Sequence, residues 1–231
     1  MSEQDVKNEE KKLAAEKAVE FIKDGMIVGL GSGTTVYFAI KKIGSLVREG
    51  LNIIAVSTSV ITTELAQSEG INLISLDEAE EIDVTIDGAD EVEKNSLNGI
   101  KGGGGALLYE KIVALSSKKN IWIVDSGKLV DVLGRYPLPV EVIPFGCKRV
   151  FKILKERKLD PVIRKNGNSD YKTDSDNYIF DLHTGEIPDV KKLNDEIKLI
   201  SGVVETGLFI GIADTVIVAR EGSTEVLEKK Q

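Results

Sequence analysis

Three carboxylates stand close together in the sequence Asp87-Gly88-Ala89-Asp90-Glu91, directly after a short apolar segment. If that segment is a strand of a parallel sheet, the acids lie at its carboxyl end, where open α/β sheets bind their ligands. Carboxylates in such a place can transfer protons in acid-base catalysis. They can equally bind a hard cation such as Mg²⁺, or form a solvated surface turn. The residues alone leave these three interpretations open.

The segment Gly31-Ser32-Gly33-Thr34-Thr35 has the composition of a loop that binds an anion. Its glycines permit a tight turn, and the helix predicted after it offers backbone N–H groups at its N-terminus. The hydroxyls of Ser32, Thr34 and Thr35 add further donors. We therefore favour a phosphate site over the alternative, a strand-to-helix connection capped by threonine. NAD is disfavoured, because Thr34 stands where the third glycine of a dinucleotide fingerprint is expected.

A second glycine-rich segment consists of Lys101 and the four residues Gly102, Gly103, Gly104 and Gly105. Glycine loses more backbone entropy on folding than any other residue, so a run of glycines usually serves a close approach or a positive φ angle. A flexible linker is the alternative. We favour a ligand loop, because the run lies between a lysine and a well-patterned helix.

Glu110 lies one turn into that helix, and its neighbours at helical spacing are apolar. Burial on the packed face of a helix raises the pKa of a carboxyl group, whereas the helix N-terminus or a nearby lysine lowers it. Such a group is suited to proton transfer. The alternative is a surface glutamate that complements the helix dipole. Lys128 follows another predicted strand, and it is either a ligand of a phosphate or oxyanion or a solvated loop lysine.

These residues are positioned by a regular alternation of strands and helices. Strands are predicted at 26–30, 52–56, 71–76, 82–86 and 121–125. Helices are predicted at 13–23, at 35–48, after Ser59 as far as Glu69, and at 106–119. Short apolar strands that alternate with helices predict an α/β fold, a doubly wound and mostly parallel Rossmann-like sheet covered on both faces.

After Arg135 the pattern changes to that of a smaller α+β domain. Prolines punctuate a strand, and a helix at 148–158, strands at 162–164 and 178–182, a helix at 190–200 and a strand at 203–209 follow. The order β-α-β-β-α-β is the ferredoxin-like motif. A last strand at 215–219 is expected to return to the large sheet, before a charged and frayed tail. The predicted domains are therefore 1–135 with 210–231, and 136–209.

Composition argues against several classes of function. A net charge of −8 and a pI near 5.0 are unfavourable for nucleic acid binding. No apolar run approaches the roughly 20 residues of a membrane span, and the N-terminus is too polar for a signal peptide. The single cysteine, Cys147, cannot form an intramolecular disulfide, so we expect a cytoplasmic protein. With His183 as the only histidine, acid-base chemistry falls to a carboxylate or a lysine.

Taken in order, the motifs resemble those of the ribose-5-phosphate isomerase family, type A, over nearly the whole chain. The matching segments are Gly31 to Thr35, Asp87 to Glu91, Lys101 through Glu110-Lys111, and Lys128. The segment from Gly202 to Phe209 is similar to the family's closing signature. Ser32 stands where threonine is common and Thr34 where serine is, and both keep a hydroxyl. The spacer from Asp90 to Lys101 is a residue longer than in some relatives.

The resemblance implies an aldose-ketose isomerase that interconverts D-ribose 5-phosphate and D-ribulose 5-phosphate through an enediolate, in the non-oxidative pentose phosphate pathway. It implies that Glu110 is the base, that Asp87 and Lys101 share the catalytic centre, and that no metal or cofactor takes part. The implied substrate site comprises Ser32, Gly33, Thr34, Thr35, Asp87, Gly88, Ala89, Asp90, Lys101, Gly102, Gly103, Gly104 and Lys128. A homodimer or homotetramer is also implied.

Three other functions are weighed against this one. A sugar-phosphate sensor would keep the phosphate loop, but it has no need of the acidic cluster, Lys101 and Glu110 together. A coenzyme A transferase would use a glutamate as nucleophile, and it would require an acyl-coenzyme A donor. A metal-dependent isomerase would be inhibited by a chelator. We rate all three below the metal-independent isomerase.

Overall fold

The computed structural model describes residues 3–229 and divides into two compact units. The large unit consists of residues 3–89, 109–129 and 211–229, and the small unit of residues 90–108 and 130–210. The division expected from the sequence differs at residues 90–108, 130–135 and 210, which group with the small unit. Within these segments lie strands of only two or three residues, and strands so short have no periodicity that predicts them.

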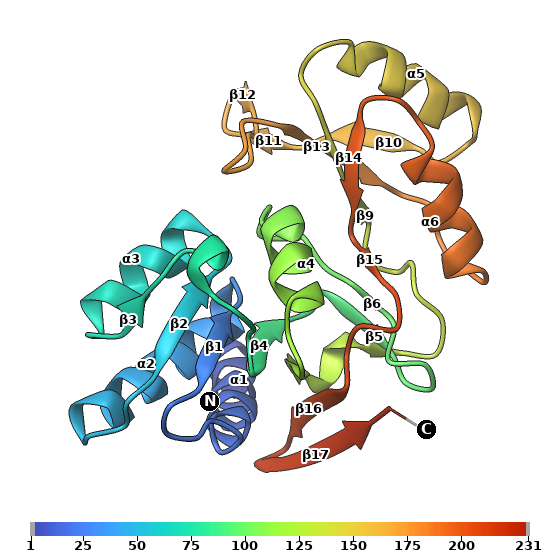
Figure 1. The fold of residues 1–231 in the computed structure, drawn as a ribbon. Coiled ribbons are helices and arrows are strands. Elements are labelled where there is room, and N and C mark those ends of the chain that lie inside the picture. Colours follow the sequence, from blue (N-terminus) through green and yellow to red (C-terminus); the bar gives the residue numbers. More distant parts are fainter. Residues whose placement is uncertain (1–2, 230–231) are drawn as a thin grey trace. The chain divides into compact units, whose positions relative to one another are not determined.

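The large unit is built on a seven-stranded sheet in the order β17-β16-β7-β4-β1-β2-β3 (Figure 1). All neighbours pair in parallel except β17, which is antiparallel to β16. The predicted doubly wound, mostly parallel sheet is thus confirmed. Its strands are β1 (Ile27–Leu30), β2 (Ile54–Ser57), β3 (Asn72–Leu73), β4 (Val84–Gly88), β7 (Asn120–Asp125), β16 (Thr215–Arg220) and β17 (Ser223–Glu228).

Strand β17 corrects the prediction of a frayed tail. It pairs with β16 from Arg220↔Ser223 to Thr215↔Glu228. The two residues between the strands, Glu221 and Gly222, both have positive φ angles, 49° and 78°. A two-residue loop of this kind matches the twist of the flanking strands. The charged composition of the tail hid this hairpin from the sequence analysis.

The helices of the large unit pack on the sheet around small and β-branched side chains. They are α1 (Glu3–Val19), α2 (Thr34–Arg48) and α3 (Val60–Ser68), with the 3-10 turns η1 (Leu76–Glu78) and η2 (Ser126–Lys128). Helix α4 (Leu107–Leu115) belongs to the large unit from residue 109 onward, and its first two residues group with the small unit. Buried alanines of α1, among them Ala14 and Ala18, pack in one core with Val28, Ile86 and Ile121 of the sheet.

Two predicted helices have different limits in the structure. Helix α1 begins ten residues earlier than expected, because Glu3 to Lys12 contains good helix formers and neither glycine nor proline. Helix α4 ends at Leu115 and not at Lys119. There the hydroxyls of Ser116 and Ser117 donate to the carbonyl oxygens of Ile112 and Val113, and such bonds compete with the helical backbone.

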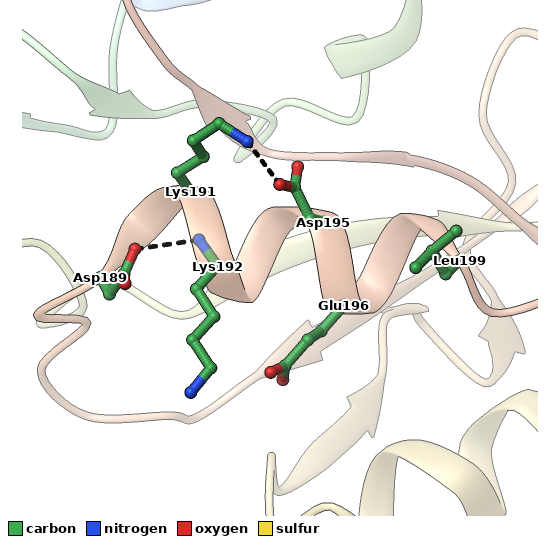
Figure 2. Close-up of a pocket in the computed structure, with 6 residues that line it drawn as sticks. All are labelled: Asp189, Lys191, Lys192, Asp195, Glu196 and Leu199. Carbon is green, nitrogen blue, oxygen red and sulfur yellow. Dashed lines mark hydrogen bonds and ion pairs between the residues drawn. The ribbon is translucent and has the colours of Figure 1, made fainter.

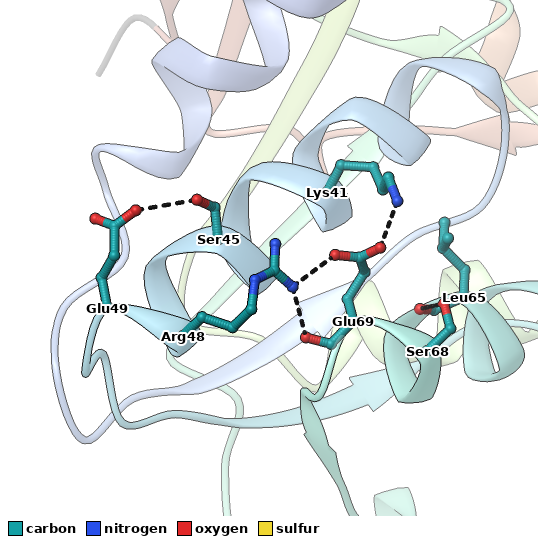
Figure 3. Close-up of polar contacts among 7 residues, drawn as sticks. All are labelled: Lys41, Ser45, Arg48, Glu49, Leu65, Ser68 and Glu69. Carbon is teal, nitrogen blue, oxygen red and sulfur yellow. Dashed lines mark hydrogen bonds and ion pairs between the residues drawn. The ribbon is translucent and has the colours of Figure 1, made fainter.

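A buried carboxylate joins α2 to the end of α3 (Figure 3). The Glu69 side chain accepts from Lys41 Nζ at 2.5 Å and from Arg48 Nη1 at 2.9 Å. These bonds hold the pKa of Glu69 below its ordinary value. Glu69 packs closely against α2 at Gly44, since a Cβ atom on Gly44 would lie 2.5 Å from the Cβ of Glu69.

Glu69→Gln is therefore expected to lower the free energy of unfolding at pH 7 by about 1 kcal/mol, the size of a partly exposed ion pair. A carboxyl pKa that is lower in the folded state stabilises the fold above the ordinary pKa, and this contribution is lost as the pH falls through the folded value. Urea unfolding at several pH values measures the difference. The difference should vanish in acid. Glu49→Gln, which removes the charge of an exposed carboxylate that accepts from Ser45 Oγ, should show no difference.

The small unit contains an antiparallel sheet in the order β10-β13-β9-β14 with two helices. The chain order β-α-β-β-α-β with this strand order is ferredoxin-like, as predicted. The elements are β9 (Leu138–Val142), α5 (Cys147–Glu156), β10 (Pro161–Ile163), β13 (Tyr178–Leu182), α6 (Val190–Lys198) and β14 (Val203–Thr206). Their inner faces form a second core that includes Val140, Leu154, Phe180 and Ile197.

Two further features of the small unit were not predicted. A short hairpin, β11 (Lys165–Asn166) and β12 (Ser169–Asp170), is inserted between β10 and β13. A second sheet joins β15 (Leu208–Phe209), β6 (Gly99–Ile100), β5 (Glu91–Glu93) and β8 (Leu129–Val130). The strand predicted at 203–209 is divided at Gly207, where a Cβ atom would overlap the Lys101 carbonyl oxygen.

In the part of the chain that the structure describes, every helix is too short or too polar to span a bilayer.

Candidate active site

The carboxyl edge of the large sheet gathers polar residues from four neighbouring strands. Strand β7 is followed by Lys128 on η2, and β4 ends in Asp87 and Gly88. Strand β1 is followed by the loop of residues 31–33, and β2 by Thr58. Parallel strands end on the same edge of a sheet, so segments far apart in sequence meet there. This edge carries the candidate site residues of the large unit.

Asp87 and the glycine loop of residues 31–35 are in direct contact. Asp87 is 1% exposed, and its Oδ1 accepts from the backbone N–H groups of Ser32 at 3.2 Å and Gly88 at 2.7 Å. A Cβ atom on Gly31 would overlap this carboxylate. Gly33, at the N-cap of α2, has a φ of 113°. The glycines are therefore required by a close approach and a turn, as expected for such a loop.

The hydroxyl of Ser32 belongs to a cluster that the sequence analysis did not identify. It lies 2.9 Å from Thr58 Oγ1, 2.7 Å from Ser59 Oγ and 3.1 Å from Thr62 Oγ1. Thr62 also donates to the carbonyl oxygen of Gly31 at 2.8 Å. Ser32 thus anchors the loop to the end of β2. The signal was present, because hydroxyl residues follow the strand that neighbours β1.

Lys11 is a second residue that the sequence analysis missed. Its Nζ donates to Thr34 Oγ1 at 3.0 Å, which brings a cation from α1 to the start of α2. It lies in a run of charged residues with no motif, so no local pattern singled it out. On the other side of the edge, Lys128 is partly buried on a turn that Asp125 caps through the Gly127 N–H at 3.1 Å.

Glu110 is 3% exposed, which rules out the surface glutamate considered as an alternative. Three residues later on α4, Val113 packs against β1, where a Cβ atom on Gly29 would lie 2.9 Å from Val113 Cγ1. Residues three apart share a helix face, so Glu110 is on the face that packs on the sheet. A helix that leads into a parallel strand runs antiparallel to the strands, which directs its N-terminal turn to their carboxyl edge.

The small unit contains the other predicted residues. Asp90 Oδ2 accepts from the Gly103 N–H at 2.7 Å, so this acid binds the glycine run directly. Lys101 is 2% exposed, and its Nζ lies 5.2 Å from the centre of the Phe209 ring. The Lys101 N–H donates to the Gly207 carbonyl oxygen at 2.9 Å. Asp90 therefore anchors the middle of the glycine run, and the backbone bond of Lys101 to Gly207 anchors the residue before it.

The glycine run is an ordered loop and not a flexible linker. Gly102 and Gly105 have positive φ angles, 102° and 87°. A Cβ atom on Gly103 would lie 2.5 Å from both Asp90 Oδ1 and Tyr136 Oη, and one on Gly105 would overlap Tyr171. Gly104 is exposed, with nothing within 4 Å of an added Cβ.

Gly105→Ala is expected to destabilise the protein by about 1–2 kcal/mol from its left-handed backbone, and by more if Tyr171 cannot move. Gly104→Ala is the matched control, because it adds the same methyl group one residue earlier into open space. Urea unfolding of both variants measures the difference. Equal free energies of unfolding for the two variants would favour the interpretation of the run as a flexible linker.

The third acid of the cluster, Glu91, has a structural role. It is fully buried, and its two oxygens accept from the backbone N–H groups of Gly134 at 2.7 Å and Tyr136 at 3.0 Å. Arg135 Nε lies 3.5 Å away. The three acids that stand together in sequence thus bind three different segments, which excludes a solvated surface turn.

A shallow hollow lies on α6 of the small unit (Figure 2). Three of its charged side chains bind one another or the helix: Lys191 pairs with Asp195 at 2.6 Å, and Asp189 accepts from the Lys192 N–H at 3.0 Å. The predicted site residues all lie elsewhere. Across residues 3–229, no three His, Cys, Asp or Glu side chains are grouped as ligands for a metal ion.

The fold defines the class as a doubly wound α/β protein with a glycine-rich loop at the carboxyl edge of its sheet. The family model described as Ribose 5-phosphate isomerase A (phosphoriboisomerase A) matches residues 54–223. The ribose-5-phosphate isomerase A of Streptococcus agalactiae serotype V is 49% identical over 223 residues, 96% of this chain and all of that protein. This chain belongs to the ribose 5-phosphate isomerase A family, as its motifs indicated.

Solved structures agree. The ribose 5-phosphate isomerase A of Methanocaldococcus jannaschii superposes with a TM-score of 0.91 at 39% identity, over 99% of this chain and 100% of that one. A D-ribose-5-phosphate isomerase in complex with phospho-erythronic acid gives a TM-score of 0.92 at 39% identity, with the same coverage. The chain is therefore an aldose-ketose isomerase that interconverts D-ribose 5-phosphate and D-ribulose 5-phosphate.

A model described as the DeoR C terminal sensor domain matches residues 6–83.

Proposed function

We propose that Glu110 is the acid-base residue of this isomerisation. The reaction removes the proton from C2 of the open-chain aldose, gives an enediolate, and returns a proton to C1, while a hydroxyl proton moves from O2 to O1. Atoms and electrons balance within the substrate. One carboxylate that lies over C1 and C2 can make both transfers. The observation that carries the proposal is the burial of Glu110 in the N-terminal turn of α4, since a carboxylate shielded from water is suited to proton transfer.

The substrate phosphate is proposed to bind the loop of residues 32–35. The start of α2 offers backbone N–H groups there, and the cations of Lys11 and Lys128 belong to the same unit. A structural relative binds phospho-erythronic acid, which combines a phosphate with a carboxylic acid. We extend sugar-phosphate binding to this chain on that basis. Gly88 and Ala89, which follow Asp87, are proposed to line the sugar.

The developing enediolate charge is assigned to Lys101 and to the backbone of Gly102, Gly103 and Gly104. A buried cation and N–H groups that are fixed in advance stabilise such a charge more strongly than water does. Asp90 orients this loop. Asp87 is proposed to exchange hydroxyl protons with the sugar during ring opening. No metal or cofactor is part of this proposal.

We also propose a homodimer or homotetramer that acts in the cytoplasm. The small unit exposes Phe145 by 91% and Leu199 by 85%, and large apolar side chains this exposed favour association. The single cysteine suits a reducing compartment.

The experiment is ribulose 5-phosphate formation from ribose 5-phosphate by the purified chain in excess chelator. Turnover at the rate seen without chelator is expected. Inhibition that added metal reverses would favour a metal-dependent isomerase. Binding of ribose 5-phosphate without turnover would favour the sensor alternative, to which the match with the DeoR domain points. Turnover only with an acyl-coenzyme A donor would favour a transferase.

A further inference from the structure

The carbonyl oxygens of the glycine run are bound by two side chains from another part of the small unit. Arg164 Nη1 donates to the carbonyl oxygens of Gly102 at 2.8 Å and Gly103 at 3.0 Å. Tyr171 Oη donates to the carbonyl oxygen of Gly104 at 3.1 Å. Three consecutive carbonyls of the loop are therefore directed toward these two side chains.

Arg164 is itself held in place. Its Nε donates to Asp181 Oδ2 at 2.9 Å and its Nη2 to Asp181 Oδ1 at 2.5 Å. Such a two-bond pair fixes the plane of the guanidinium group. The side chains of Arg164 and Asp181 are 13% and 19% exposed, and the guanidinium lies 5.8 Å from the centre of the Tyr171 ring. Arg164 can therefore present Nη1 to the loop in one orientation.

Arg164 and Tyr171 leave the backbone at the base of one hairpin. They flank β11 and β12, and the Tyr171 N–H donates to the Arg164 carbonyl oxygen at 2.9 Å. This hairpin is the insertion between β10 and β13, which the ferredoxin-like motif does not require. Its base thus carries both side chains that bind the carbonyl oxygens of the glycine run.

Because of the geometry of the peptide group, these contacts determine the direction of the Gly104 N–H. The C=O and N–H of a trans peptide point to opposite sides, and the Gly103 carbonyl shares its peptide with the Gly104 N–H. Of the neighbouring donors, the Gly103 N–H binds Asp90 and the Gly105 N–H binds the Gly102 carbonyl oxygen at 3.0 Å. Within residues 3–229, the Gly104 N–H makes no hydrogen bond.

We propose that Arg164 is a positioning residue that fixes the Gly103–Gly104 peptide so that the Gly104 N–H donates to an oxyanion of the reacting sugar. The inference rests on the proposed role of the glycine run in the isomerisation. Asp181 sets the orientation of Arg164, and Tyr171 supports the next peptide. A donor that is fixed in advance acts on charge that develops in the transition state, so it affects kcat more than KM.

The test compares Arg164→Ala and Arg164→Lys with the wild-type chain. Lysine keeps the charge, but it cannot bridge two carbonyls and a carboxylate in one plane. A fall in kcat of about 10²-fold is expected for both, the size of a lost or misplaced oxyanion donor, with KM for ribose 5-phosphate little changed. Millimolar guanidinium should restore part of the turnover of Arg164→Ala and none of that of Arg164→Lys.

Arg157→Ala is the matched control, because Arg157 also donates to a backbone carbonyl of the small unit, that of Glu196 at 2.8 Å. It should keep wild-type kcat. Asp181→Asn should lose part of the turnover, and Tyr171→Phe less than Arg164→Ala. Thermal unfolding of each variant shows whether a loss of turnover comes from unfolding or from a misplaced peptide. If Arg164→Ala does not fold, Arg164→Lys provides the test.

Wild-type kcat in both Arg164 variants, or a rise in KM with kcat unchanged, would overturn the inference. So would a loss of activity in Arg164→Ala that guanidinium does not restore although the variant is folded. The proposed function fails on different results, namely no turnover by the wild-type chain or full turnover by Glu110→Gln.

Discussion

Glu110→Gln is expected to lower kcat for ribose 5-phosphate by about 10²- to 10⁴-fold, the range that a general acid-base residue contributes. Glutamine has the same shape and can keep hydrogen bonds, but it cannot accept the C2 proton at neutral pH. Because Glu110 is 3% exposed, the substitution also replaces a buried charge by a neutral group of equal volume, which need not destabilise the fold. Steady-state kinetics and equilibrium binding of ribose 5-phosphate measure the two effects separately.

Glu141→Gln is the matched control for this variant. Glu141 is 1% exposed in the small unit, and its Oε1 accepts from Thr173 Oγ1 and Asn177 Nδ2, both at 2.9 Å. An amide oxygen can accept the same two bonds, so turnover should be unchanged. Equal turnover by wild type and Glu110→Gln would remove Glu110 from the chemistry. Loss of substrate binding in Glu110→Gln would show that Glu110 positions the sugar and does not transfer the proton.

Lys101→Met is expected to lower kcat by about 10²- to 10³-fold, the effect of deleting one strong stabiliser of a developing oxyanion. Methionine keeps much of the volume of the buried lysine stem, but it removes the cation beside the Phe209 ring and provides no charge or donor. The loss should appear in kcat more than in KM, because the enediolate charge exists only beyond the ground state. Initial rates over a range of ribose 5-phosphate concentrations separate the two parameters.

Lys172→Met is the control for Lys101→Met, since Lys172 is an exposed lysine of the same unit that pairs with Asp176 at 3.0 Å. It should be as active as the wild type. A Lys101→Met variant with unchanged kcat and a raised KM would indicate that Lys101 binds the substrate uniformly. The enediolate charge would then have to be stabilised by the backbone of the glycine run.

Elements with a clear hydrophobic pattern were predictable from the sequence. The strands of the large sheet at Ile27–Leu30 and Asn120–Asp125 are short apolar runs between turn signals, and they lie where the pattern placed them. Strand β17 and the two-residue strand β6 escaped prediction for different reasons. The first is charged and depends on the turn at Glu221 and Gly222, and the second has too few residues to show a period.

The positions of the site residues that follow parallel strands were predictable, because sheet topology brings the ends of these strands together. The positions of the other site residues were not. Parallel strands end on one edge, so the glycine loop and Asp87 could be expected to meet, and they do. Local spacing could not show that Glu91 turns away to bind the 134–136 backbone. Arg164 was equally hidden, because it reaches Gly102 from 62 residues away in sequence, on a hairpin with no motif.

The most direct test of Glu110 is exchange at C2. Ribose 5-phosphate deuterated at C2 is incubated with the wild-type chain and with Glu110→Gln in ordinary water, in chelator, and loss of the label is followed by NMR together with ribulose 5-phosphate formation. The account predicts that the wild-type chain removes the C2 deuteron and forms product, with a slower rate than for unlabelled substrate when proton removal limits turnover. Glu110→Gln should bind the sugar and remove almost no deuteron. Removal of the C2 deuteron by Glu110→Gln at the wild-type rate would contradict the account.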